Sequence, residues 1–241
     1  AEARTIIEQE LETTVEGRFA DFTWEPVAAA SIAQVHFAVT TEGEEVAVKV
    51  LRPNVEEAFA KDMALFHWIA QLVERARPDL RRLKPVEVIE TFEETIRLEM
   101  DLRLEAAAAQ ELAENFADDK DFRVPGVDWR RTSRRIFTLE RVSGIPIDER
   151  DSLIEAGHDP DDILIRAATS LFKQVFRDGF FHADQHPGNL FVGEAGEIVA
   201  VDFGIMGALN NQDKYYIAEN LIAFFNRDYR RIAKLHLDSG W

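Results

Sequence analysis

The sequence predicts an α+β protein of two lobes, a small lobe of β-strands and helices followed by a mainly helical lobe. Alternating apolar residues in 34–40 and 44–51 flank the turn "TEGE", which is typical of a β-hairpin. Long segments with helical spacing of apolar residues follow, and Gly144 and Pro146 then interrupt the chain. We therefore expect the boundary between the lobes near residues 142–147.

The expected domains are an N-terminal lobe over 1–143, which includes an N-terminal helix and long inserted helices, and a truncated C-terminal lobe over 144–241. The length of 241 residues is enough for two small lobes with a sizeable core. The chain starts without a Met and within helical periodicity, which indicates a piece of a longer protein.

Composition excludes several classes of function. The net charge of -17 repels phosphate backbones, so we expect no nucleic-acid partner. The absence of cysteine excludes disulfides, thiolate zinc sites and a cysteine nucleophile, and it fits a reducing compartment. No run of 18 apolar residues exists, so we expect no transmembrane segment and a cytoplasmic location.

The individual elements follow from spacing and capping signals. Ile6, Ile7, Leu11 and Val15 form one helical stripe. Asn54 is the expected cap of a long amphipathic helix. The remaining predicted elements are a helix over 85–116 interrupted once, two strands within 122–142, helices over 148–157, 160–178, 212–225 and 227–237, and strands over 189–192 and 197–202.

The stretch "FFHADQHPGNLFVGEAGEIVAVDFG" carries the strongest functional signal. His182, Asp184 and Asn189 fit H-x-D-x-x-x-x-N, the catalytic-loop pattern of protein kinases, and Asp202 opens the following D-F-G. Phosphoryl transfer needs one carboxylate facing the acceptor and oxygen ligands for Mg²⁺. We assign Asp184 to the first task, and Asn189 and Asp202 to the metal.

Two other interpretations of this stretch exist. Asp, Asn and Gly are also common turn residues, so a capped turn would give the same composition. His182 and His186 have the i, i+4 spacing of a zinc site on a helix, but Pro187 and Gly188 argue against a helix there.

Lys49 in "VAVKV" matches the strand lysine of kinases, which reaches the phosphates of the nucleotide. On its own it would be an exposed strand lysine. Such a lysine needs a carboxylate partner, and Glu99, Asp101 and Glu105 are the candidates. We favour Glu105, because it adjoins four alanines that permit close packing against the strands.

Kinase elements are missing elsewhere. Where protein kinases have the glycine-rich loop over the phosphates, this chain has "EPVAAASIAQVH", which otherwise resembles a helix start. The β-carbons of Ala28, Ala29, Ala30 and Ser31 oppose the conformations that glycine permits, so the phosphates must sit differently. Ala183 replaces the Arg of the kinase catalytic loop, and no A-P-E follows, which weakens a protein-substrate interpretation.

With these motifs in order, the chain resembles the UbiB/AarF family of atypical kinases, which has a two-lobed protein-kinase-like fold. The matching segments lie between about residues 26 and 210; they are "AAASIAQVH", "VAVKV", "EMDLRLEA", "HADQHPGNLF" and "VDFG". The catalytic segment alone also resembles aminoglycoside-type kinases. The alanine-rich loop and "EMDLRLEA" distinguish the two groups.

The resemblance implies an atypical kinase or ATPase that binds ATP or ADP with Mg²⁺ and supports ubiquinone or isoprenoid-lipid metabolism. It implies that Lys49 contacts phosphates and pairs with Glu105, and that Glu99 and Asp101 form the E-x-D element of the group. It also implies catalytic and metal roles for the catalytic-loop residues named above.

Further implications concern partners. The adenine is expected at the backbone of Glu140 to Val142. Isoprenoid lipid or membrane-associated biosynthetic enzymes are implied partners, and membrane association is implied for the full-length protein. The family's K-x-G-Q helix and C-terminal membrane helices have no counterpart here. A nucleotide-switched binding module and a small-molecule phosphotransferase remain alternatives.

Overall fold

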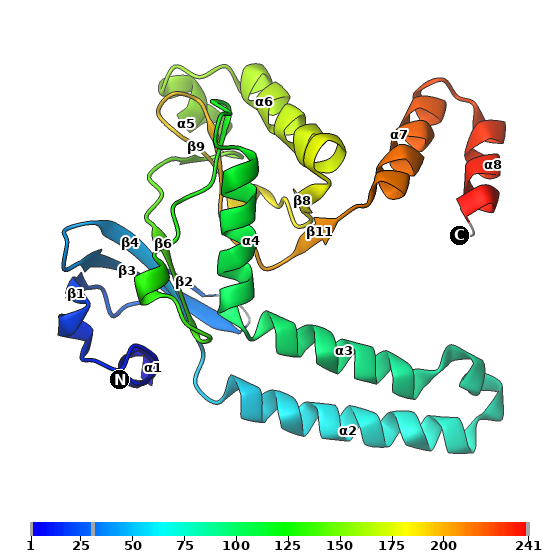
Figure 1. Cartoon of the computed structure of the whole chain (residues 1–241), viewed down its shortest axis with the longest axis horizontal. Helices are drawn as coiled ribbons and strands as arrows, with labels where there is room; N and C mark the ends of the chain where they lie inside the picture. The colour runs from blue at the N-terminus through cyan, green and yellow to red at the C-terminus, as the bar shows by residue number, and fades with distance from the viewer. Residues whose placement is uncertain (1, 30–31, 240–241) are drawn as a thin grey trace. The chain divides into compact units, whose positions relative to one another are not determined.

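The computed structural model describes residues 2–29 and 32–239 and divides the chain into two compact units. The first unit comprises Ala1–Gln110 and Pro125–Val142, and the second comprises Glu111–Val124 and Ser143–Trp241. Both units combine helices with short sheets (Figure 1), so the α+β class predicted from the sequence is confirmed. The chain leaves the first unit at Val142, and the second unit also takes in the earlier segment 111–124.

A five-stranded antiparallel sheet forms the centre of the first unit. Its order is β1-β3-β4-β6, and β2 also pairs with β3. The predicted hairpin is β3 and β4, with Val35 opposite Lys49. The strands are β1 (Phe19–Phe22), β2 (Ala28–Ala29), β3 (Ala33–Thr40), β4 (Glu45–Leu51) and β6 (Ile136–Glu140).

One hydrophobic cluster of this unit lies on one face of the sheet. Alternation in β4 buries Val46, Val48 and Val50, which cluster with Ile6 and Ile7 of α1 (Glu2–Glu10). Since side chains alternate across a strand, Lys49 belongs to the opposite face. The face of the sheet that carries Lys49 is therefore separate from this cluster.

The expected single helix through Val15 is wrong in its length. It ends at Glu10, and Glu12 has a left-handed backbone with φ 52, which a continuous α-helix excludes. Leu11 and Val15 still enter the core, Val15 from the 3₁₀ turn η1 (Val15–Gly17). The hydrophobic stripe thus predicted burial correctly although the helix stops early.

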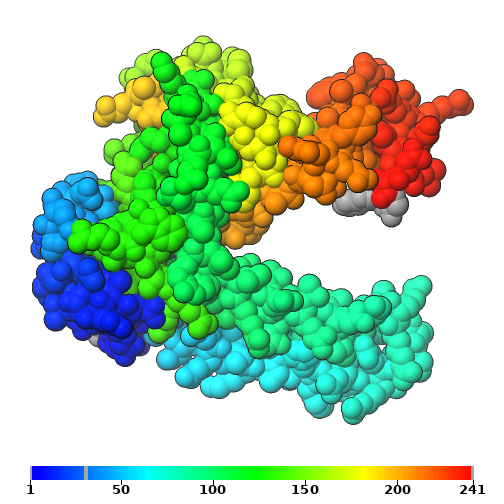
Figure 2. Space-filling view, viewed as in Figure 1, coloured from blue at the N-terminus to red at the C-terminus, as the bar shows by residue number. Residues whose placement is uncertain are grey.

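A helical hairpin follows β4. Helices α2 (Val55–Ala76) and α3 (Pro85–Glu99) pack side by side (Figure 2) and are joined by η2 (Pro78–Leu83). His67 Nε2 of α2 lies 3.0 Å from Glu93 Oε2 of α3. Asn54 occupies the cap position, but with φ 58 its side chain makes no capping hydrogen bond, so its predicted capping role is wrong.

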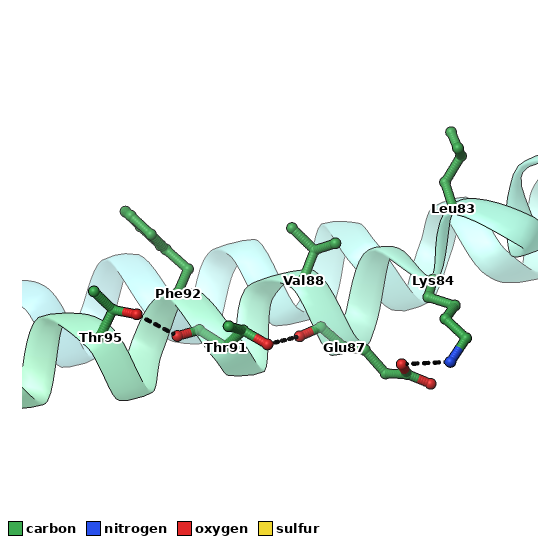
Figure 3. A pocket seen from close by; sticks show the side chains of 7 residues that line it. All are labelled: Leu83, Lys84, Glu87, Val88, Thr91, Phe92 and Thr95. Carbon is green, nitrogen blue, oxygen red and sulfur yellow. Dashed lines mark hydrogen bonds and ion pairs between the residues drawn. The ribbon is translucent and has the colours of Figure 1, made fainter. Parts of the chain in front are cut away.

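The outer surface of this hairpin is partly apolar. Leu83 of η2 and Val88 and Phe92 of α3 project to the same side (Figure 3) and line a pocket of about 480 Å³. Thr91 and Thr95 donate their hydroxyls to carbonyls one turn earlier in the helix, which removes two polar groups from this surface. None of the residues assigned to catalysis, nucleotide or metal lines this pocket.

The predicted interruption of the next helix is confirmed. Helix α3 ends at Glu99, and α4 (Leu102–Asn115) begins after Met100 and Asp101. Helix α4 contributes its last residues to the second unit. There, Phe116 packs 4.6 Å from Phe122 between ring centroids.

The second unit is mainly helical, as expected. Its helices are α5 (Arg150–Glu155), α6 (Pro160–Phe172), the π-helix η4 (Lys173–Asp178), α7 (Asn211–Phe225) and α8 (Tyr229–Ser239). The helix predicted over 160–178 is therefore α-helical only to Phe172. In the described residues, no helix is both long and apolar enough to cross a membrane.

Two small sheets hold the functional stretch of this unit. One has the order β5-β10-β9-β7, and the other pairs β8 with β11. The strands are β5 (Phe122–Arg123), β7 (Ile145–Pro146), β8 (Phe180–His182), β9 (Leu190–Val192), β10 (Ile198–Ala200) and β11 (Met206–Ala208). The first strand expected within 122–142 shrinks to β5, which pairs with β10 rather than with β6, and η3 (Trp129–Arg131) precedes β6.

Candidate functional site

Lys49 and Glu105 form an ion pair in the first unit. Nζ of Lys49 donates to Oε1 of Glu105 at 2.7 Å. The side chains are only 13% and 7% exposed, so solvent screens the pair little. The pairing favoured from the sequence is therefore present, while the catalytic roles of both residues stay predictions.

The strand and the helix that carry this pair fix its geometry. Lys49 lies within β4 opposite Phe137 of β6, in the middle of the sheet. Glu105 lies in the first turn of α4, where Ala106 and Ala109 are fully buried. Small residues at these positions permit close packing of the helix backbone, as the alanine run predicted.

Asp101 caps the helix that carries Glu105. Its Oδ1 accepts from the backbone N–H of Arg103 at 3.2 Å, and both carboxylate oxygens accept from the Arg103 guanidinium at 2.8 and 2.6 Å. The hydrogen bond from the Arg103 side chain lowers the pKa of Asp101. Glu99, by contrast, is exposed at the end of α3.

The described part of the alanine-rich segment is a short strand. Ala28 and Ala29 form β2 and pair with Val35 and Gln34. A helix start, the alternative for this segment, is therefore wrong for these two residues. Ala30 and Ser31 lie outside the described residues.

The segment expected at the adenine ends β6. The backbone N–H of Glu140 donates to the Gly126 carbonyl at 2.8 Å, and that of Arg141 donates to the Glu45 carbonyl at 3.0 Å. Both N–H groups are thus used within the first unit. An adenine contact at Glu140 to Val142 depends on the remaining backbone groups.

The second unit brings the catalytic-loop residues together. Nδ2 of Asn189 donates to the Asp184 carbonyl at 3.2 Å. The backbone N–H of Val201 donates to the Asn189 carbonyl at 2.8 Å, so the loop lies beside the residue that precedes Asp202. Asp184, Asn189 and the start of D-F-G therefore belong to one local framework.

His182 is the buried centre of this framework. Its Nδ1 accepts from the backbone N–H of Asp184 at 3.2 Å, and its Nε2 lies 3.4 Å from the Val201 carbonyl. A ring nitrogen that accepts carries no proton, so a neutral ring donates from Nε2. Phe203 packs against the ring at 5.8 Å between centroids.

The zinc alternative has no support in this geometry. His182 lies at the end of β8, and Nδ1 of His186 accepts from the Gly188 N–H at 3.1 Å. Both rings are therefore engaged with the backbone, His182 at the end of a strand and His186 as the cap of the 3₁₀ turn η5 (Pro187–Asn189), and the two do not share an α-helix. Within residues 2–29 and 32–239, no group of three His, Cys, Asp or Glu side chains forms a metal cluster.

Asp202 has a backbone conformation that is uncommon for a residue with a β-carbon. Its φ is 63, in the left-handed region. Such conformations persist where the surroundings impose them, and they cluster at functional sites. Phe203, which is 1% exposed, anchors the adjacent residue in the core.

The oxygen donors of this unit suit Mg²⁺. The Asn189 amide donates through Nδ2, which leaves its Oδ1 oriented as an acceptor, and Asp202 adds a carboxylate. Magnesium is held by one or two protein oxygens, with waters and substrate phosphates completing the octahedron. The residues present therefore fit a magnesium ion that arrives with a phosphate ligand.

Sequence reasoning missed one buried contact of the loop. Gln174 of η4 is fully buried, and its Oε1 accepts from the backbone N–H of His182 at 2.9 Å. The only signal in the sequence is a polar residue within the apolar pattern of a helix. That signal does not identify the group that the side chain contacts.

Comparison with known proteins gives consistent results. A family model described as the ABC1 atypical kinase-like domain matches residues 1–236. The chain is 43% identical over its whole length to a probable protein kinase UbiB of Marinobacter nauticus, and 46% identical over 98% of its length to that of Pseudomonas aeruginosa. It spans 45% of the length of each relative.

A solved structure shares the fold. The Rv3197–erythromycin complex of Mycobacterium tuberculosis has a TM-score of 0.76 and 26% identity, covering 97% of this chain and 58% of that chain. These matches confirm the family and the kinase-like fold predicted from the sequence motifs. The chain belongs to the ABC1 family of atypical kinase-like domains, together with its UbiB relatives.

Proposed function

We propose that this domain binds ATP or ADP with Mg²⁺ and acts as a slow ATPase or phosphotransferase. The observation that carries the proposal is the buried ion pair of Lys49 and Glu105. Desolvating two charges offsets much of their attraction, so such a pair is weak evidence for stability and needs another reason. We infer that Glu105 positions the Lys49 ammonium so that it can bind phosphate oxygens of the nucleotide.

The second unit would supply the metal and catalytic groups. Asn189 and Asp202 would hold Mg²⁺ through oxygen, and the ion would neutralise charge on the phosphates. Asp184 would orient the attacking hydroxyl or water. The backbone N–H of Asp184 donates to the His182 ring, and its carbonyl accepts from the Asn189 amide. These two hydrogen bonds fix the backbone from which the Asp184 side chain extends.

Family membership supports a proposal for the pathway. Because the relatives are UbiB proteins, we propose a role in ubiquinone or isoprenoid-lipid metabolism, with lipid or membrane-associated biosynthetic enzymes as partners. A cytoplasmic protein that associates with membranes in its full-length form fits this role. The chain spans less than half the length of these relatives, so a role of the whole relatives comes to this chain only as a proposal.

The test is ATP turnover with and without Mg²⁺, in wild type and in Asp184→Asn and Asp202→Ala. We expect turnover only with Mg²⁺ and a loss of at least about 100-fold in each variant. Liposomes containing a quinone precursor analogue should raise the wild-type rate. Equal rates in all three proteins would remove the enzymatic proposal.

A nucleotide-switched binding module is the second candidate. The alanine strand β2 favours it, because its residues pair with β3 where a glycine-rich loop would cover the phosphates. Calorimetry separates the two candidates. Tight binding of nucleotide with Mg²⁺, without turnover in the presence or absence of liposomes, would select the module.

A further inference from the structure

The helix before the catalytic loop ends in an uncommon form. Helix α6 continues into the π-helix η4, which covers Lys173–Asp178. The backbone N–H of Gly179 donates to the Gln174 carbonyl at 2.8 Å, and Gly179 has φ 72. Short π-helical turns are rare, and they occur frequently at functional sites.

Gln174 ties this turn to the strand that leads into the loop. Its backbone carbonyl accepts from Gly179, and its side-chain Oε1 accepts from the N–H of His182. The same residue thus fixes the end of the helix and the end of β8. A β-carbon on Gly179 would lie 2.6 Å from the Leu209 carbonyl, so this turn tolerates little variation.

The contact continues to the catalytic loop through His182. The N–H of that residue is held by Gln174, and its ring Nδ1 holds the N–H of Asp184. Two successive hydrogen bonds therefore connect a buried side chain of the helix to the backbone of Asp184. The ring also reaches the Val201 carbonyl, next to Asp202.

Packing alone does not explain a glutamine at this position. Gln174 is 0% exposed, and its Nε2 has no hydrogen-bond partner among the described residues. A buried amide nitrogen without a partner is destabilising, whereas an apolar side chain of similar volume would carry no such penalty. The hydrogen bond to His182 is the compensating feature.

We propose that Gln174 is a positioning residue, which acts through His182 to set the orientation of Asp184. This inference rests on the proposed function, because the orientation of Asp184 affects catalysis only if the domain turns over nucleotide. The positioning itself is a property of the backbone and is measurable without turnover.

The test compares Gln174→Met with Gln174→Glu and with the control Ser170→Ala. Methionine keeps the volume and removes the acceptor. Glutamate keeps an acceptor oxygen for the His182 N–H in either protonation state, and burial raises the pKa of a carboxyl group, which favours the neutral, glutamine-like form. Ser170 is also buried, one turn earlier, but its hydroxyl bonds the Ala167 carbonyl and not the loop.

We expect Gln174→Met to lower kcat by at least about tenfold, with little change in nucleotide Kd. Amide hydrogen exchange at His182 and Asp184 should accelerate in the same variant. Ser170→Ala should change the melting temperature without either effect. Gln174→Glu keeps the acceptor, so it should keep kcat and the exchange rates at both amides close to those of wild type where its carboxyl group is protonated.

Unchanged kcat and unchanged exchange at both amides in Gln174→Met would overturn the proposal. If that variant does not fold, Gln174→Glu decides: accelerated exchange at His182 and Asp184 in this variant, at a pH where its carboxyl group is protonated, contradicts the inference because the acceptor is still present. If wild type shows no turnover, the proposed function fails. The exchange rates then still show whether Gln174 holds the loop.

Discussion

At the residue scale, variants of the ion pair of Lys49 and Glu105 distinguish a role in nucleotide binding from a role in stability. We predict that Glu105→Gln destabilises the fold by about 3 kcal/mol, because it removes a carboxylate that pairs with the largely buried ammonium of Lys49. Urea unfolding measures the change. The double variant Lys49→Met, Glu105→Leu should regain stability without regaining nucleotide binding, and recovery of both would contradict the role assigned to the pair.

A second prediction at this scale concerns pH. A hydrogen bond from the Arg131 guanidinium lowers the pKa of Glu42 to about 2. A depressed pKa in the folded state contributes stability above the unfolded pKa and loses it as the pH falls through the folded value. Wild type should therefore be more stable than Glu42→Gln near neutral pH, and the difference should shrink between about pH 5 and pH 2.

Thermal unfolding of both proteins across this range is the measurement. A difference that stays constant with pH would show that the carboxylate of Glu42 does not contribute through its charge. Arg131 is itself 3% exposed and also contacts Asp128, so the guanidinium stays in place in the variant.

At the element scale, the start of α4 links local sequence to the site. Asp101→Ala removes the cap and should cost about 1 kcal/mol, and it should weaken nucleotide binding by loosening the helix that carries Glu105. Asparagine is also a good cap, so Asp101→Asn should retain most of the stability and most of the affinity for nucleotide. Thermal unfolding followed by circular dichroism measures the stability, and calorimetry measures the affinity.

If Asp101→Ala and Asp101→Asn lose nucleotide affinity equally, the carboxylate charge of Asp101, rather than its capping hydrogen bond, is what supports binding. Glu94→Gln is the matched control, since Glu94 is exposed on α3 and has no assigned role in the site.

The elements that the sequence predicted well are those with a strong period. The β3–β4 hairpin and α2 follow from alternation and from helical spacing, and the break between α3 and α4 was expected. Elements fixed by tertiary contact were missed. Strand β1 has no local signal and pairs with β3, and the π-helix η4 has the same apolar spacing as an ordinary helix.

The same distinction applies to the candidate site. Lys49, Asp184, Asn189 and Asp202 were found because motifs fix their order along the chain. Their supporting contacts were not found, because a hydrogen bond such as that of Gln174 to His182 depends on the depth at which a helix packs. Spacing in the sequence carries no information on that depth.

At the scale of the whole molecule, the proposed function draws on residues of both units. The first unit carries Lys49 and Glu105, and the second carries Asn189 and Asp202, the proposed oxygen donors for the metal. The central claim is that binding of magnesium nucleotide requires residues from each unit. Removing Lys49 or Asp202 should therefore abolish the same ligand effect.

The most direct measurement is the melting temperature with Mg²⁺ and ATP together, compared with Mg²⁺ alone. A ligand at 100 times its Kd stabilises a folded protein by about 2.7 kcal/mol, which raises the melting temperature of a domain of this size by several degrees. We predict this rise in wild type, and its loss in both Lys49→Met and Asp202→Ala. No rise in wild type, or an equal rise in all three proteins, would contradict the account.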